Sequence, residues 1–353
     1  IKYLSGLGKK MGKIKNIDIA KISESELLDL KICDLPVKIE DSWLEDCIKQ
    51  LYQELDKKKI RFKPACYLAD EWLAPDKEPI IGIPFFLAHR RLVKLEKKMM
   101  IEAEGSNRHW CMKLLRHETG HAINYAYKLY RRKKWRKIFG NFGQVYPDTY
   151  RFRPYSKSFV RHLEDYYAQY HPDEDFAETF AVWLTPGLNW RKKYKGWKAL
   201  DKLLYLDETM NEIKDKEPLV KRGNKYWQHS NMRIKLKNFY KKKKHYYAED
   251  FPDFHDANLK KIFLKEDNCQ KKKESLESAA NFIKRYKKDI LNSTAFWTGE
   301  KKYIISDLIS TISKRVKELK LVVDGAEDTI LTGISIYITT LIMNYLHTGR
   351  FRK

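Results

Sequence analysis

The chain has 353 residues, of which 43% are hydrophobic, and it carries a formal net charge of +24 at pH 7. A chain of this size and composition can bury a full core and is expected to divide into two or three lobes. The five cysteines are scattered, odd in number and without C-x-x-C spacing, which argues against a disulfide framework or a cysteine-based zinc cage. They indicate a reducing compartment, and residues 1–16 lack the apolar run of a signal peptide, so a cytoplasmic location is expected.

Apolar periodicity predicts a helix over residues 40–58 and strands over 60–69 and 80–87. A proline at position 84 interrupts the second strand, and proline is tolerated on edge strands. This strand is therefore either an edge that pairs with an extended peptide or an ordinary sheet strand. Two longer helices follow, at about 108–132 and 172–185, joined by a loop-rich segment.

Residues 117–121 read HETGH and place two imidazoles and a carboxylate on one turn of the first long helix. Histidines at i and i+4 lie on the same helical face, so His117 and His121 can bind one divalent cation. Glu118 points roughly 100° away and is placed to hold and deprotonate a metal-bound water. H-E-x-x-H on a helix is the signature of zinc hydrolases, whereas two histidines in an ordinary helix are the plain alternative.

The neighbours of this motif repeat with helical periodicity. Leu114, Leu115 and Ala122 share a side with the two histidines, which predicts that the metal-binding side faces the interior. Arg116 is expected to project from the opposite side. Gly120 indicates either the close approach of another backbone or tight helix packing, and the sequence leaves both open.

A catalytic zinc normally takes three protein ligands and leaves one position for water. Metzincins would have glycine at 124 and histidine at 127, but this chain has Asn124 and Tyr127, which excludes that class. The second long helix supplies Glu174 and Glu178, four residues apart, so one can bind the metal while the other orients a ligand histidine. We assign Glu174 as the ligand and Glu178 as the orienting residue, with the reverse kept open.

The second long helix begins with Pro172 and a run of acidic residues. The fixed φ of proline and the helix dipole both favour this composition at a helix N-terminus. Asp173 and Asp175 are accordingly interpreted as ordinary helix-start charges.

Several segments resemble a bacterial family of zinc-binding metallopeptidases, most specifically residues 115–127 and 166–186, and more weakly 83–89 and 247–254. The resemblance extends roughly from residue 40 to past 250. It implies a gluzincin, with one zinc ion per chain held by two histidines and a glutamate. The implied fold is zincin-like and α+β, predominantly helical, with a small mixed sheet and a helical C-terminal region.

The spacing of Glu174 and Glu178 is also similar to that in the catalytic domain of anthrax lethal factor, and more distantly to thermolysin. This similarity supports Glu174 as the ligand. Lethal factor has a tyrosine seven positions before its ligand glutamate, which corresponds to Tyr167 here.

These residues predict peptide hydrolysis. Zinc lowers the pKa of a bound water to around 7, and Glu118 would take the proton of that water and pass it to the departing amine. A further donor is needed as the oxyanion develops. We assign this role to Tyr167, and the reserve candidates are Tyr166, Tyr170 and His162.

The expected units are an N-terminal extension (1–39), a zincin-like catalytic domain (40–215) and a lysine-rich helical subdomain (216–353). The longest apolar stretch, 330–346, contains several polar residues, which favours a buried or amphipathic helix over a membrane span. No membrane partner is therefore expected.

Basic runs containing aromatic residues occur at 131–137, 191–198 and 239–247. The first two flank the predicted catalytic helices, so they could favour acidic peptides or bind nucleic acid. A merely solvated lysine-rich surface is the preferred interpretation, and no recognised nucleic-acid-binding motif occurs.

The leading hypothesis is an intracellular zinc endopeptidase acting on a peptide or protein substrate. One alternative is a nucleic-acid-associated basic protein with a minor or structural zinc site. Another alternative is a zinc hydrolase that does not cleave peptides. The sequence leaves the oligomeric state open.

Overall fold

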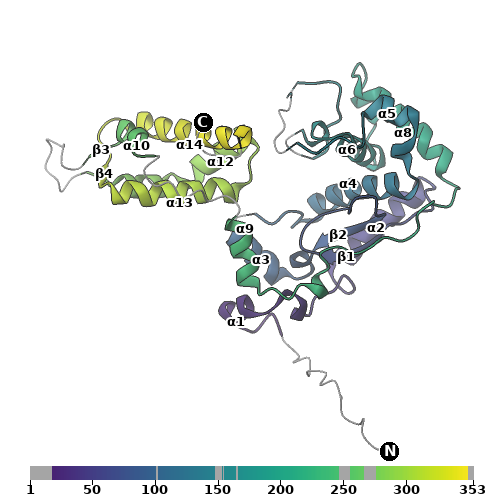
Figure 1. Cartoon of the computed structure of the whole chain (residues 1–353), viewed down its shortest axis with the longest axis horizontal. Coiled ribbons are helices and arrows are strands. Elements are labelled where there is room, and N and C mark those ends of the chain that lie inside the picture. The colour runs from purple at the N-terminus through teal and green to yellow at the C-terminus, as the bar shows by residue number, and fades with distance from the viewer. Residues whose placement is uncertain are drawn as a thin grey trace, which may run out of the picture.

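The computed structural model describes residues 18–100, 102–147, 153, 155–163, 166–245, 255–265 and 276–348. The described chain is predominantly helical with little strand, consistent with the α+β class. One hydrophobic core is built from residues between Ile19 and Tyr240, and a second from residues between Leu259 and Ile342. In Figure 1 the helices of the second core form a separate lobe beside the rest of the molecule.

The elements that contribute to the first core are α1 (Glu24–Asp29), α2 (Trp43–Lys57), β1 (Ala65–Ala69), β2 (Ile80–Pro84), α3 (Arg90–Met100), α4 (Arg108–Ala126), α5 (Lys133–Phe139), α6 (Pro172–Leu184), α7 (Trp190–Lys193), α8 (Ala199–Ile213) and α9 (Leu236–His245). Short 3-10 helices lie at Ile32–Asp34, Phe85–Ala88, Leu129–Arg131, Tyr167–Gln169 and His229–Asn231. Leu236 and Tyr240 of α9 lie in the first core, and the boundary expected at residue 215 stays a prediction.

The second lobe contains α10 (Asp256–Ile262), β3 (Leu264–Lys265), α11 (Ala279–Arg285), α12 (Lys287–Thr298), α13 (Lys302–Glu318), β4 (Leu321–Val322) and α14 (Glu327–Thr348). Within the described ranges, α14 alone is long and apolar enough to cross a membrane by length and composition. Its buried face, which includes Ile330, Ile334 and Ile338, belongs to the second core. The four-residue spacing of these isoleucines is typical of a helix packed on a core.

The sheet of the first core is short and mixed. β1 and β2 run parallel, with Ala65 opposite Ile80 and Ala69 opposite Pro84. On the other side of β2, Leu73 and Gly82 form an antiparallel bridge. Because β2 is wholly buried and has partners on both sides at this point, the ordinary-strand interpretation fits it better than an open edge for substrate. The strand ends at Pro84, earlier than predicted, and continues as a 3-10 helix.

The two long helices predicted around the motif are α4 and α6. The side chain of Asn107 caps α4 by accepting the Trp110 N–H at 2.9 Å. The helix ends at Ala126 instead of 132, because Lys128 takes a left-handed conformation with φ of 49°. His171 caps α6 through its ring, Pro172 occupies the first turn, and the helix ends at Leu184.

α4 and α6 lie close together at Gly120. A Cβ atom at this position would lie 2.7 Å from Ala177 Cα and 3.0 Å from the Ala177 carbonyl oxygen, both backbone atoms of α6. The close approach of another backbone and tight helix packing are therefore the same feature here. The absence of a side chain at Gly120 lets the histidines of α4 reach the carboxylates of α6.

We expect Gly120→Ala to lower the free energy of unfolding by about 1–3 kcal/mol, because overpacking against α6 outweighs the gain in helix propensity of about 1 kcal/mol. It should also weaken metal binding, because α4 and α6 must move apart. Gly333→Ala in α14 is the control, since its Cβ would meet Ile262 Cγ2 at 3.6 Å and Ile262 Cγ1 at 3.8 Å, both at ordinary contact distance. Urea unfolding of both variants measures the difference. A Gly120→Ala protein as stable as wild type would contradict this packing.

Candidate metal centre

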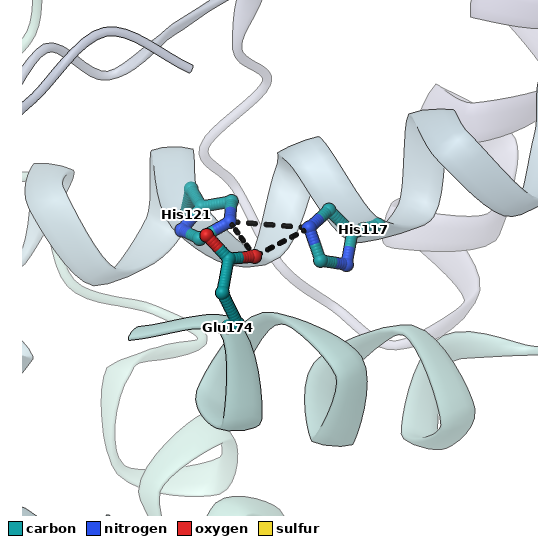
Figure 2. A group of neighbouring side chains, drawn as sticks. All are labelled: His117, His121 and Glu174. Atoms are coloured by element: carbon teal, nitrogen blue, oxygen red, sulfur yellow. Dashed lines mark hydrogen bonds and ion pairs between the residues drawn. The ribbon is translucent and has the colours of Figure 1, made fainter. Parts of the chain in front are cut away.

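Two histidines of α4 and one glutamate of α6 converge in the interior of the first core (Figure 2). His117 Nε2 and His121 Nε2 lie 3.2 Å apart, and Glu174 Oε2 lies 3.1 Å from the first and 3.2 Å from the second. All three residues are buried, and their ligand atoms lie within 4.8 Å of one another. The structure thus brings together the three residues that the sequence predicts as ligands, and this group could hold a metal ion.

The outer nitrogen of each histidine contacts a second carboxylate of α6. His117 Nδ1 lies 2.9 Å from Glu178 Oε1, and His121 Nδ1 lies 2.9 Å from Asp173 Oδ2. An ionised carboxylate only accepts, so each Nδ1 donates. In a neutral imidazole this leaves the lone pair on Nε2, which faces Glu174. Such outer partners fix the tautomer and ring orientation of metal-binding histidines.

Glu178 is itself fixed by the backbone. Its second oxygen, Oε2, accepts the N–H of Leu163 at 2.9 Å. The residue is 1% exposed. Its two oxygens contact the outer nitrogen of His117 and the Leu163 N–H, so neither is directed to the centre of the cluster. This is the placement expected from the spacing of Glu174 and Glu178, with Glu174 the member that faces both Nε2 atoms.

Asp173 is not the ordinary helix-start charge that the sequence predicts, because it is 1% exposed and belongs to the site. Besides contacting His121, its Oδ1 accepts the side-chain N–H of Asn124 at 2.7 Å. The hydroxyl of Tyr125 donates to Oδ2. A buried carboxylate with three donors is held in one orientation, and it can therefore hold the His121 ring in turn.

Replacing Asp173 with asparagine is expected to weaken zinc affinity about 10- to 100-fold, because an amide oxygen accepts from the His121 ring less strongly and its NH₂ group opposes the donors around it. Competition against a chromophoric chelator measures the affinity. Asp201→Asn is the control, since this exposed aspartate occupies the first turn of α8. Equal affinities in the Asp173→Asn variant and wild type would contradict an orienting role for Asp173.

The charges in the cluster depend strongly on one another. Burial alone would lower the pKa of His117, but contacts with Glu174 and Glu178 raise it to about 10. Burial likewise opposes the charge on His121, but Asp173 and Glu174 raise its pKa well above the ordinary value. Burial disfavours the charge on Glu174, but the two histidines hold its pKa below the usual range. The buried carboxylates thus favour positive charge at the centre of the cluster.

Glu118 follows the first histidine on α4 and is 7% exposed. Burial raises the pKa of its carboxyl, an effect that the neighbouring His117 and His121 reduce. No residue in the described ranges forms a hydrogen bond with its carboxylate. Glu118 is therefore available to accept a proton beside the cluster.

The candidate oxyanion donors differ in placement. The ring of Tyr167 lies 5.6 Å from the ring of His117, beside the cluster. The hydroxyl of Tyr170 donates to the Pro147 carbonyl at 2.9 Å, which engages it in the loop. His162 is bonded through Nε2 to a backbone carbonyl, and burial lowers its pKa to about 4. The Tyr166 ring lies 5.3 Å from the guanidinium of Arg161.

Tyr146 also belongs to the site, although nothing in the sequence indicates it. Tyr146 precedes α6 by a loop, and its hydroxyl donates to Glu174 Oε1 at 3.0 Å. Desolvation and the charges of Glu174 and Asp173 raise the pKa of the Tyr146 phenol, which keeps it protonated as a donor. No local pattern could have identified Tyr146, because the contact joins residues 28 positions apart.

Two buried ion pairs beside the site also correct sequence predictions. Arg116 does not project outward but forms two hydrogen bonds of 2.8 Å with the buried Glu54 of α2. Asp175 is not a solvated helix-start charge but pairs with Lys202 of α8 at 2.5 Å. Burial raises the pKa of Asp175 to about 7 despite the lysine. These pairs connect α4 and α6 to the helices behind them.

The first two basic runs have acidic partners in α8. Arg132 pairs with Glu212 at 2.8 Å, and Lys134 pairs with Glu208 at 2.5 Å. In the second run, Arg191 pairs with Asp207 at 2.5 Å. Part of the positive charge is thus neutralised within the fold. The end of the third run, residues 246–247, lies outside the described residues, as does the 247–254 segment of the family resemblance.

The described geometry defines a predominantly helical α+β chain with a buried two-histidine, one-glutamate cluster that could hold a metal ion. No protein-family model, curated protein or solved structure matches this chain. The resemblance to the bacterial zinc-metallopeptidase family therefore stays a prediction and depends on the motifs alone.

Proposed function

We propose that this chain is a zinc-dependent metallopeptidase of the gluzincin type, with a zincin-like catalytic domain. The observation that carries this proposal is the convergence of His117, His121 and Glu174 near Glu118, whose carboxylate forms no hydrogen bond with any residue that the structure describes. Three ligands leave one position of a tetrahedral zinc open for water or substrate, as catalytic zinc sites require. A structural site would instead be closed by a fourth protein ligand.

The residues present fit a zinc ion. Two imidazole nitrogens and one carboxylate oxygen are a common donor set for catalytic zinc. Each histidine has a buried carboxylate on its outer nitrogen, and the surrounding negative charge favours a dication. A bound zinc ion would polarise the scissile carbonyl and make a water molecule acidic enough to attack near neutral pH.

The chain's own residues would complete the reaction. Glu118 would accept the proton of the attacking water and deliver it to the departing amine nitrogen, so that one carboxylate acts first as base and then as acid. Burial supports this role, because a raised carboxyl pKa makes Glu118 a stronger base. Tyr167 would donate to the developing oxyanion, which contributes about 3 kcal/mol in comparable sites.

The substrate in this proposal is a peptide or protein, and a preference for acidic sequences would follow from the net charge of +24. Four of the cysteines lie in the described residues as free thiols, which supports the proposed cytoplasmic location. A nucleic-acid-associated protein and a zinc hydrolase acting on other bonds remain the competing functions.

The test is digestion of a peptide library by the full chain, with and without a chelator. We expect cleavage that the chelator abolishes and added zinc restores. Chelator-insensitive cleavage, or none by zinc-loaded protein, would contradict the proposal. Salt-dependent retention on DNA, together with no cleavage, would instead favour the nucleic-acid alternative.

A further inference from the structure

Tyr146 contacts Oε1 of Glu174, the carboxylate oxygen that does not lie between the Nε2 atoms of the two histidines. The Tyr146 hydroxyl donates to Oε1 at 3.0 Å, whereas Oε2 lies 3.1 Å from His117 Nε2 and 3.2 Å from His121 Nε2. The two oxygens of this carboxylate thus have separate partners. Oε1 belongs to a protein hydrogen bond, and Oε2 alone is directed to the point between the imidazoles.

The Tyr146 ring is held on two sides. It stacks on the ring of His171, with centroids 3.8 Å apart and planes inclined by 13°, and it meets the ring of Tyr170 edge-on at 5.5 Å. Both neighbours also bind the backbone of the same loop. His171 Nε2 contacts the Gln144 carbonyl at 3.0 Å, and the Tyr170 hydroxyl donates to the Pro147 carbonyl at 2.9 Å.

The His171 ring is itself fixed. Its Nδ1 accepts the N–H of Asp173 at 3.1 Å, which makes His171 the cap of α6, the helix that carries Glu174. Since Nδ1 accepts, Nε2 carries the proton and donates to the loop. The start of α6 and residues 144–147 are therefore joined by hydrogen bonds, which hold Tyr146 and Glu174 in a fixed relation.

We propose that Tyr146 is a positioning residue that restricts Glu174 to binding the metal through a single oxygen. This inference depends on the metal centre of the proposed function, but not on the reaction it catalyses. A free carboxylate can bind a cation through one oxygen or both. The hydrogen bond from Tyr146 occupies one lone pair of Oε1 and holds that oxygen in place, so Oε1 binds a cation less readily than Oε2 does. The phenol thus helps to keep the fourth position open for water or substrate.

Cobalt substitution tests this inference without measuring hydrolysis. Co²⁺ accepts the same donors as zinc, and its visible absorption is much stronger with four ligands than with five. We expect the Tyr146→Phe variant to bind one Co²⁺ per chain with visible absorption lower by about twofold or more, because Glu174 then binds through both oxygens. Its zinc affinity should fall by about tenfold, because the hydrogen bond that orients Glu174 is lost.

Tyr170→Phe is the matched control. It removes a phenol from the same loop that bonds to a backbone carbonyl and not to Glu174. We expect its cobalt spectrum to equal that of the wild type. A wild-type spectrum in Tyr146→Phe would overturn the inference, and so would the same spectral change in both variants, since the loop and not the Glu174 contact would then be responsible.

The proposed function can fail separately. Wild-type protein that binds cobalt and shows the Tyr146→Phe spectral change, but cleaves no peptide, would refute the peptidase and leave the positioning role intact. Wild-type protein that binds no cobalt would overturn this inference directly.

Discussion

Replacing Glu118 with glutamine is expected to reduce peptide hydrolysis about 10²- to 10⁴-fold while zinc content stays at the wild-type level. Glutamine has nearly the same shape, but its amide cannot accept the proton of the attacking water. Glu118 is not one of the three residues that form the cluster, so metal binding should be preserved. Loss of rate with retained zinc is what separates a general base from a ligand.

The measurement is kcat/KM on one cleaved peptide, together with the zinc content of the same preparation. Glu102→Gln is the control, because this exposed carboxylate lies before α4 and pairs with Lys302 at 3.7 Å. It should retain full activity. A Glu118→Gln protein with wild-type activity would refute the proposed mechanism, whatever its zinc content.

Glu174→Ala is expected to weaken zinc affinity far more than Glu178→Ala. Glu174 offers an oxygen at 3.1 and 3.2 Å from the two Nε2 atoms, whereas Glu178 contacts one of the two histidines, His117, through its outer nitrogen. Loss of an outer partner costs about 10- to 100-fold in affinity. Removing one of the three ligands should weaken the zinc affinity by more than this range, because a direct bond to the metal is then lost.

Chelator competition gives both affinities on one scale, and circular dichroism of the metal-free variants checks that each is folded. The two glutamates are a matched pair, since both are buried on α6 and differ only by one helical turn. Equal losses would contradict the assignment of Glu174 as the ligand, and a larger loss in Glu178→Ala would exchange the two roles.

The sequence predicts the central part of the site because that part is local. The spacing within residues 117–121 places both imidazoles on one helical face regardless of the rest of the fold. Glu174 comes from a different helix, and its identification required the expectation that a third ligand exists. The structure places it beside both histidines, as the spacing of the two glutamates suggests.

The supporting residues could not be predicted in the same way. An acidic residue in the first turn of a helix looks the same in sequence whether it is solvated or buried, so the sequence predicts solvated charges at Asp173 and Asp175, which the structure buries. The helical pattern predicts an outward Arg116, because its buried partner Glu54 comes from the packing of α2 and not from the local sequence. Tyr146 reaches the site through a loop whose path depends on His171 and Tyr170.

Elements were predicted better than their ends. The helix and strands expected over residues 40–58, 60–69 and 80–87 appear as α2, β1 and β2, each shorter than predicted. The first motif helix stops six residues early, because the backbone at Lys128 turns left-handed and starts a 3-10 helix. Apolar periodicity continues through such a break, so the pattern alone does not reveal it.

The most direct test of the metal centre is the zinc content of the purified chain, measured by mass spectrometry after dialysis against metal-free buffer. We predict about one zinc ion per chain in the wild type and almost none in a variant with both His117→Ala and His121→Ala. Wild-type protein without zinc, or a double variant that retains as much zinc as the wild type, would contradict the assignment of this cluster as a metal site.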